Sequence, residues 1–360
     1  MKHRQVTMGK VGALNSDGHA IGVDLGAGAV RATVLSPGTM DGRPSVTVHG
    51  AGQVELPPGA VVNGVVSDQG AVTRALKELW EKNKFECRSV ILGITNQQVV
   101  VRDLTLPNLS PEQLAMALPF QAREIVPIPL DQALLDFAPL GEPDLHNETV
   151  TGLLIAAPRS PVVAAVEAVE RAGLRVARVD LSSFALLRSI AGDDRSVEAV
   201  IDIGAHLTNI VIHNHGIPKV VRAVTRGGSE LTEMLVSKAG LDTETAEAAK
   251  CEIGLTGPDP RVADAMNQAV RPLLAEIRSS IQYFGSTNAG ARIERISLTG
   301  GGARLRGLAE LLAQQVDAPT RVVSPTQHIR NRLLPSGQPD GHTETAATAV
   351  SVGLAMGAAA

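Results

Sequence analysis

A strand interrupted by a carboxylate and then a glycine occurs twice in this chain. The two stretches are IGVDLGAGAVRATVLS at residues 21–36 and AVIDIGAHLTNIVIHN at residues 199–214. When Asp24 is aligned with Asp202, a glycine follows two positions later in both stretches, and an alanine follows the glycine. A buried strand does not carry a carboxylate without compensation. We therefore interpret each stretch as two strands joined by a functional turn.

A tight turn after a strand presents successive backbone N–H groups, which form a cradle for an anion. Glycine lets the backbone approach a phosphate without a Cβ in the way. A carboxylate beside a phosphate makes sense if a hydrated Mg²⁺ lies between them, so we expect Asp24 and Asp202 to hold Mg²⁺ through water. Either turn alone could be a hairpin with an exposed aspartate, but two matched turns favour a nucleotide site. The predicted phosphate-binding residues are Gly26, Ala27, Gly28, Ala29 and Arg31 in the first turn and Gly204, Ala205, His206, Leu207 and Thr208 in the second.

A third segment, SLTGGGARLRG at residues 297–307, places three glycines between an expected strand and an expected helix. The missing side chains leave room for a nucleoside against the backbone. A glycine-rich turn alone is weak evidence, and its position after the second Asp-x-Gly stretch is what gives it weight. The sequence contains no G-x-x-x-x-G-K-[ST] motif, which excludes a P-loop enzyme.

The order of expected elements indicates an internal duplication. Each half opens with a strand pair around Asp-x-Gly and continues with strands and helices, as expected for two similar α/β domains in 360 residues. Two helix starts are well marked: Asp68 is a candidate N-cap, and Ser110 to Gln113 form a capping box. The predicted organisation is a flexible tail at 1–19, a first lobe at 20–86 and 156–195, an inserted subdomain at 87–155, a second lobe at 196–340 and a C-terminal helix returning to the first lobe at 341–360.

Composition excludes several classes of function. The formal net charge is −4, so no basic excess indicates nucleic-acid binding. No run of eighteen apolar residues occurs, which argues against a membrane span, and the Ala/Gly-rich C-terminal end favours a helix packed into a core. The two cysteines, Cys87 and Cys251, lack the spacing of a zinc site or a disulfide framework and fit a reducing cytosol.

The three glycine-containing segments, in this order, resemble the actin-like ATPase superfamily. VDLGAGAVR is similar to its first phosphate motif, IDIGAHLTNIVI to its second and SLTGGGARL to its adenosine motif. From about residue 20 onward the chain resembles the PilM family of type IV pilus assembly, a relative of the division protein FtsA, through LGITNQQVVVRDLTLP, ALPFQAREIVPIPLDQALLDFAPLG and other stretches. The resemblance implies two lobes of the duplicated RNase H-like, actin-like fold, with ATP and Mg²⁺ in the cleft between them. The adenosine-binding residues it implies are Glu247, Lys250, Gly300, Gly301, Gly302 and Arg304.

The resemblance also implies a partner. Members of the PilM family capture the cytoplasmic N-terminal peptide of PilN, a single-pass membrane protein, in a groove beside the inserted subdomain. Other pilus platform proteins and the assembly ATPase are further expected partners, and no nucleic acid is expected. The implied location is the cytoplasmic face of the inner membrane, reached only through the partner. In this sequence the candidate groove residues are Leu114, Leu118, Ile125 and Ile128, although each could instead pack inward.

One departure from the family pattern affects catalysis. Many relatives carry Glu-Pro where the helix between the lobes begins, and that carboxylate orients the attacking water. Here Ser182 and Ser183 stand in those places, and Asp180 is nearby but is expected to point elsewhere. We therefore expect slow or absent hydrolysis, and we assign no catalytic residue beyond noting that Asp180 and Ser182 lie near the water-activating position.

Three alternative functions remain open from the sequence. A small-molecule kinase of the same superfamily would need a carboxylate base for its acceptor hydroxyl, and no convincing candidate is present. An FtsA-like membrane tether would need a C-terminal amphipathic helix with basic residues, which the Ala/Gly-rich end lacks. A pure scaffold without nucleotide binding is disfavoured by the intact Asp24, Asp202 and triple glycine.

The pair His213 and His215 has a spacing that could place both side chains on one face of a strand, as a metal site requires. The alternative, a polar hairpin turn around Asn214 and Gly216, is favoured.

Overall fold

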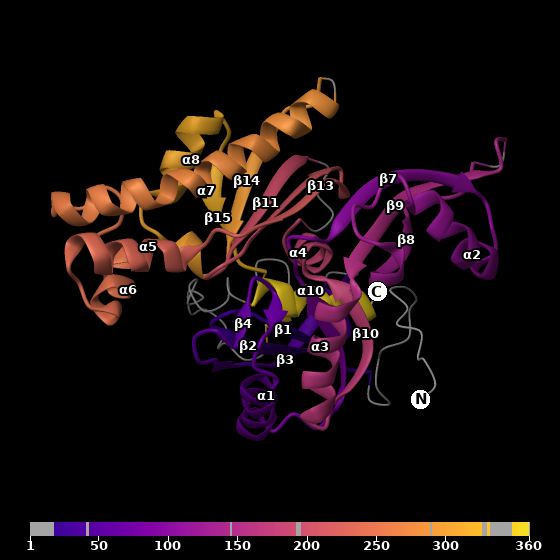
Figure 1. Cartoon of the computed structure of the whole chain (residues 1–360), viewed down its shortest axis with the longest axis horizontal. Helices are drawn as coiled ribbons and strands as arrows, with labels where there is room; N and C mark the ends of the chain where they lie inside the picture. The colour runs from indigo at the N-terminus through magenta and orange to yellow at the C-terminus, as the bar shows by residue number, and fades with distance from the viewer. Residues whose placement is uncertain are drawn as a thin grey trace.

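The computed structural model describes residues 18–40, 43–144, 146–191, 196–288, 290–325, 330–331 and 348–359. Two α/β lobes lie side by side, and a smaller subdomain extends from the first (Figure 1). The sequence expectation for the N-terminal tail falls on residues that lie, except for Gly18 and His19, outside this described part.

The two lobes have the same strand topology. In the first sheet, β1 pairs antiparallel with β2 and parallel with β6, and the order is β10-β6-β1-β2-β3-β16. In the second sheet, β11 pairs antiparallel with β12 and parallel with β14, and the order is β13-β12-β11-β14-β15. The strands of the first sheet are β1 (Ala20–Leu25), β2 (Ala29–Met40), β3 (Arg43–Glu55), β6 (Ser89–Ile94), β10 (Arg175–Leu181) and β16 (Arg330–Asn331). Those of the second are β11 (Val197–Ile203), β12 (Thr208–Asn214), β13 (Ile217–Val224), β14 (Arg295–Thr299) and β15 (Thr320–Val322).

Helices cover both faces of the first sheet. On one face, α1 (Gln69–Asn83) and α3 (Arg159–Arg171) bury Val72, Leu76 and Val169 against β1 and β2. The predicted cap holds, because Asp68 Oδ1 accepts a hydrogen bond from the Ala71 N–H at 2.9 Å. On the other face lie α4 (Ser182–Ile190) and α10 (Ala349–Ala359), and the burial of α10 confirms a C-terminal helix packed in a core.

The second lobe has one large core beneath its sheet. It is built on the long helix α7 (Pro260–Thr287), with α5 (Gly228–Met234), the π-helical turn η2 (Leu235–Ala239), α6 (Thr243–Glu252), η3 (Gly301–Arg304) and α8 (Leu308–Val316) around it. Between the lobes, α4 packs Leu186 and Ile190 against Val200 and Val211 of the second sheet. This helix is therefore the apolar link between the two lobes.

The smaller subdomain is a three-stranded antiparallel sheet with one helix. Its strand order is β7-β9-β8, from β7 (Val100–Pro107), β8 (Ala133–Pro139) and β9 (Thr149–Pro158). Its helix α2 (Pro111–Ala122) begins with the expected capping box, and a short turn, η1 (Leu130–Gln132), precedes β8. We call residues 100–158 the insertion. A separate small hairpin joins β4 (Val61–Val62) to β5 (Val65–Val66) in the first lobe.

Two sequence-based boundaries differ from the structure. The insertion was expected at 87–155, but β6 lies in the first sheet between β1 and β10. Its apolar run is buried on both faces, as a central parallel strand requires. The second lobe was expected to run to residue 340, but β16 pairs with β3 of the first sheet, so the chain has returned to the first lobe by Arg330.

Candidate functional site

The two Asp-x-Gly turns have the same geometry. In the first, the Gly26 N–H donates to the Ala29 carbonyl at 3.0 Å, and in the second the Gly204 N–H donates to the Leu207 carbonyl at 2.9 Å. The carboxylates also have matched cross-strand neighbours, because Asp24 lies opposite Arg31 and Asp202 lies opposite Asn209. The sequence repeat is therefore a structural repeat, with one turn from each lobe.

The two carboxylates lie in a shared electrostatic environment. Burial raises the pKa of Asp24, and the Arg31 guanidinium, whose Nη1 is 3.5 Å from Asp24 Oδ2, partly offsets this. Burial and then the negative charge of Asp24 raise the pKa of Asp202 to about 6. Two half-buried carboxylates that repel one another favour a cation between or beside them.

Asn209 adds a further oxygen ligand to this region. Its Nδ2 donates to Asp202 Oδ2 at 3.3 Å, while its buried Oδ1 has no hydrogen-bond partner among the described residues. Two carboxylates and an unpaired amide oxygen form the kind of oxygen-rich donor set that Mg²⁺ takes, directly or through its waters. The residues present therefore fit the predicted cation.

The triple glycine brings the third segment against the second turn. Gly300 has a φ of +84°, and a Cβ there would approach the Asp202 carboxylate closer than 3.0 Å. A Cβ on Gly302 would similarly overlap the side chain of Ile203. No side chain fits at these two positions, because the β14–η3 connection lies directly on the strand that carries Asp202.

These segments line one cleft between the lobes, with a cavity of about 310 Å³. Of the predicted residues, the lining includes Asp24, Gly26, Ala27, Gly28, Arg31, Ser182, Asp202, Gly204, Ala205, His206, Leu207, Glu247, Lys250, Gly300, Gly301, Gly302 and Arg304. Ala29, Thr208 and Asp180 are not among the residues that line it. Ala29 acts through its carbonyl inside the first turn, and Thr208 is buried with its hydroxyl on the Arg226 carbonyl.

Several lining residues were missed by sequence reasoning. Polar examples are Asn63, Thr95, Asn209 and Ser229, and apolar examples are Val270, Leu273 and Leu308. A signal existed for the start of α5, where the Gly228 and Ser229 N–H groups donate to the Gly204 and Ala205 carbonyls at 2.9 Å. The glycine pair Gly227 and Gly228, at the start of that helix, could have indicated this close approach. The apolar members read in the sequence as ordinary core positions.

The expected base or ribose contacts form a compact polar group. Lys250 Nζ lies 2.7 Å from Glu247 Oε2 and donates to the Gly228 carbonyl at 3.1 Å. Thr232 Oγ1 donates to Glu247 at 2.5 Å and accepts from Lys250 at 2.7 Å. The side chain of Lys250 is therefore held at the cleft wall, in contact with the start of α5.

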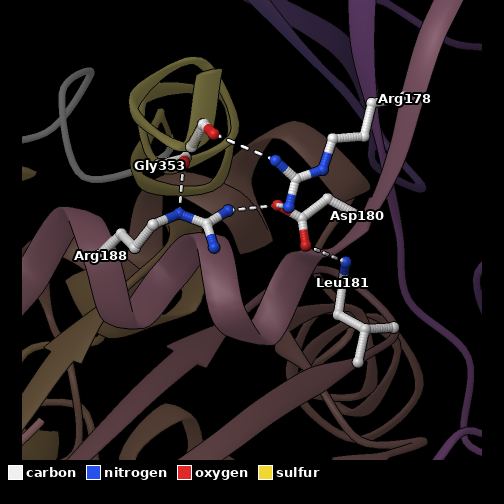
Figure 2. A network of polar contacts seen from close by, with 6 residues as sticks. Arg178, Asp180, Leu181, Arg188 and Gly353 are labelled. Atoms are coloured by element: carbon white, nitrogen blue, oxygen red, sulfur yellow. Dashed lines mark hydrogen bonds and ion pairs between the residues drawn. The ribbon is translucent and has the colours of Figure 1, made fainter. Parts of the chain in front are cut away.

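Ser182 and Asp180 lie in different parts of the structure. Ser182 is the first residue of α4 and lines the cleft. Asp180 instead forms an ion pair with Arg188 and lies 4.0 Å from Arg178, on the α10 side (Figure 2). Both arginines also donate to α10, Arg188 to the Gly353 carbonyl at 3.0 Å and Arg178 to the Gly357 carbonyl at 3.1 Å. Asp180 thus anchors α10 and does not face the cleft.

The predicted groove residues of the insertion all pack on its own apolar core. Leu118 is only 5% exposed and packs inside the insertion, while Leu114, Ile125 and Ile128 are half-buried against the same core. The exposed apolar side chains of α2 are Met116, at 67%, and Phe120, at 71%. They stand one helical turn apart, on the side away from Leu118.

The histidine pair does not form a metal site. His213 is fully buried, its Nδ1 accepts from the Gly216 N–H at 3.1 Å, and its Nε2 lies 3.2 Å from Glu198. His215 sits exposed in the hairpin turn with a φ of +53°. No group of three His, Cys, Asp or Glu side chains that could hold a metal ion occurs among the described residues. The hairpin interpretation therefore holds for this stretch.

The duplicated sheets, the matched turns and the glycine-lined cleft between the lobes define an actin-like ATPase fold. The chain belongs to the family of the type IV pilus assembly protein PilM, whose family model matches residues 22–359. Within the part of the chain that the structure describes, no helix is both long and apolar enough to cross a membrane.

Solved structures agree with this family. A chain of a PilM–PilN type IV pilus biogenesis complex has a TM-score of 0.80 and 28% identity, over 95% of this chain and 98% of that one. The ethanolamine utilization protein EutJ from Carboxydothermus hydrogenoformans has a TM-score of 0.55 and 16% identity, covering 96% and 92% of the two chains. MreB 5 of Spiroplasma citri bound to AMPPNP has a TM-score of 0.52 and 13% identity, covering 94% and 95%. The last two likenesses concern the fold alone.

A curated relative points to the same superfamily. The cell division protein FtsA of Bacillus subtilis (strain 168) is 21% identical over 326 residues, covering 78% of this chain and 74% of FtsA.

Proposed function

We propose that the cleft binds ATP with Mg²⁺ and that the protein acts in type IV pilus assembly as a nucleotide-binding component. The observation that carries the proposal is the convergence of both Asp-x-Gly turns and the triple glycine on one cavity. The AMPPNP-bound MreB 5 shares this fold, which agrees with a nucleotide in the cleft.

Each part of the cleft has a distinct task in this proposal. The backbone N–H groups of the two turns and the Arg31 guanidinium hold the phosphates. Asp24, Asp202 and Asn209 hold the cation, which offsets phosphate charge when it is bound. The flat backbone at Gly301 and the Glu247–Lys250 group receive the nucleoside. Because Ser182 replaces the family carboxylate and Asp180 faces α10, we infer that hydrolysis is slow or absent.

Calorimetric titration of the purified protein with ATP in the presence of Mg²⁺ tests the site. The double variant Asp24→Ala/Asp202→Ala should lose Mg²⁺-dependent affinity. The matched control Asp103→Ala/Asp131→Ala removes two exposed carboxylates of the insertion and should bind as the wild type does. Unchanged affinity in the first variant would show that the nucleotide site lies elsewhere.

We further propose that the insertion captures the cytoplasmic tail of a PilN-type membrane protein. The related solved structure is a PilM–PilN complex, and α2 exposes Met116 and Phe120 as apolar anchors. Because Leu118 stabilises the insertion from within, these two residues are better anchor candidates than the buried side of the helix. A few well-placed apolar contacts can supply most of the affinity for a disordered tail.

The test is binding of the synthetic tail peptide, followed by fluorescence anisotropy. Met116→Ser/Phe120→Ser should weaken binding, whereas Val163→Ser, which removes an exposed apolar side chain from α3, should not. Equal binding by both variants would place the tail on another surface.

A further inference from the structure

A second groove lies between the insertion and the second lobe. Its volume is about 460 Å³. One wall is the first half of β7 with the preceding loop, and the other is β13 with the C-terminal part of α7 (Figure 1). None of the residues proposed for nucleotide or tail binding lines it.

Both walls of this groove are edge strands. Among the described residues, β13 is hydrogen-bonded to β12 alone in its sheet, and β7 to β9 alone. An edge strand presents a row of unpaired N–H and C=O groups, and such a row can pair with an added strand. Proteins with this arrangement recognise extended peptides through main-chain hydrogen bonds.

The groove also combines an apolar contact with positively charged walls. Val101 and Leu153 are buried and pack against Val221, so apolar side chains join the two sheets there. The lining carries the cations Arg102, Lys219 and Arg222 and the single anion Asp103.

The three cations differ in whether a nearby anion neutralises their charge. Arg222 Nη2 lies 2.8 Å from Glu276 Oε2, so its charge is largely paired. Within the described ranges, no ion pair involves Arg102 or Lys219. The groove therefore has an excess of positive charge that a negatively charged occupant would offset.

From these features we propose that the groove binds an extended, acidic segment of a partner protein as an added strand beside β13. Successive side chains of a strand point to opposite sides. A segment with alternating apolar and acidic residues can thus place its apolar side chains against the half-buried Val221 and its acidic side chains toward Arg102 and Lys219. This site is separate from the nucleotide cleft and from the exposed face of α2.

The probe is a fluorescein-labelled decapeptide in which valine alternates with glutamate, titrated with the full chain and followed by anisotropy. Saturable binding is expected, and Lys219→Glu should weaken it by about fivefold, as removal of a partly exposed ion pair does. The control Lys238→Glu makes the same charge change at an exposed site outside the groove and should bind as the wild type does. No binding, or equal weakening by both variants, would overturn the proposal.

A second probe isolates the main-chain pairing. The same decapeptide with every backbone nitrogen methylated keeps its charges but has no N–H group to donate from either edge. It should fail to bind. Equal binding of the methylated and unmethylated peptides would show that no strand is added.

Discussion

Glu198 is a buried carboxylate that remains charged because its neighbours donate to it. Burial would raise its pKa, but hydrogen bonds from His213, Arg295 and Ser297 outweigh this effect and lower the pKa to about 2. The Gly216 N–H donates to His213 Nδ1, so the proton of the neutral ring is on Nε2, which faces Glu198. The network lies at the end of β11 opposite to Asp202, and its role is structural.

Replacing this carboxylate should destabilise the protein in a pH-dependent way. A carboxyl with a pKa of about 2 in the folded state, against an ordinary 4.5, contributes about 3 kcal/mol to the free energy of unfolding at neutral pH. The contribution is complete above pH 4.5 and disappears as pH falls toward 2. Chemical denaturation of Glu198→Gln should therefore show a loss of about this size at pH 7 that shrinks below pH 4.5. Glu276→Gln, which removes the half-exposed ion-pair partner of Arg222, is the control, with an expected change under about 1 kcal/mol. A pH-independent loss would contradict the electrostatic account.

Ser182 offers a test of why hydrolysis is expected to be slow. It lines the cleft at the start of α4, the position at which the resemblance to actin-like ATPases implies a carboxylate. A positioned general base contributes about a hundredfold or more to a rate, so Ser182→Glu should raise ATP turnover by at least about tenfold. Ser182→Gln introduces a side chain of about the size of glutamate without its charge, and it should not raise the turnover. A wild-type turnover near ~10 per second, typical of enzymes, would show instead that another group activates water.

At the scale of elements, α10 is fixed by close backbone contact. A Cβ on Gly353 would lie closer than 3.0 Å to the carbonyl of Ala185 in α4, and a Cβ on Gly22 would similarly meet Ser351 of α10. Two glycines thus bring α10 against both the strand that carries Asp24 and the helix that begins with Ser182. The arginines beside Asp180 also hold α10, because Arg188 donates to the Gly353 carbonyl in its middle and Arg178 to the Gly357 carbonyl near its end (Figure 2).

Gly353→Ala should separate α10 from α4. Backbone atoms cannot yield as a flexible side chain can, so the expected loss in unfolding free energy is about 3 kcal/mol. Thermal unfolding measures it, with Gly285→Ala as the control. Gly285 is in α7 with open space around its Cβ position, and alanine there should stabilise the helix by about 0.5–1 kcal/mol. A Gly353→Ala variant as stable as the wild type would mean that α10 packs more loosely than described.

The parts of the fold and of the candidate site that could be predicted from the sequence are those that have local signals. Asp24 and Asp202 with their glycines predicted both strand pairs, and Ser110 with Gln113 predicted the start of α2, because turn and cap chemistry is local. The sheet to which β6 belongs could not be predicted, since a short apolar run does not specify the strands with which it pairs. Leu118 and Met116 were equally ambiguous, because α2 carries apolar residues on both sides and only the fold shows which side is covered.

At the scale of the whole molecule, two of the three proposed binding sites span the two lobes, namely the nucleotide cleft and the groove beside β13. The nucleotide cleft takes Asp24 from the first lobe and Asp202 from the second. The groove takes β7 from the insertion, which is built onto the first lobe, and β13 from the second. Any occupant of either site therefore limits rotation of one lobe against the other.

If both proposals hold, the two ligands should bind cooperatively. A ligand that has already restricted lobe rotation lowers the ordering cost for the next one, so the acidic decapeptide should tighten ATP affinity by about threefold to fivefold. Linkage requires ATP to tighten peptide affinity by the same factor. Calorimetry in both directions measures the two factors, and in Lys219→Glu the effect of the same peptide concentration on ATP affinity should fall. Two unequal factors would indicate a flaw in the measurements. Factors of one, with both ligands bound, would contradict the coupling of the two sites through the lobes.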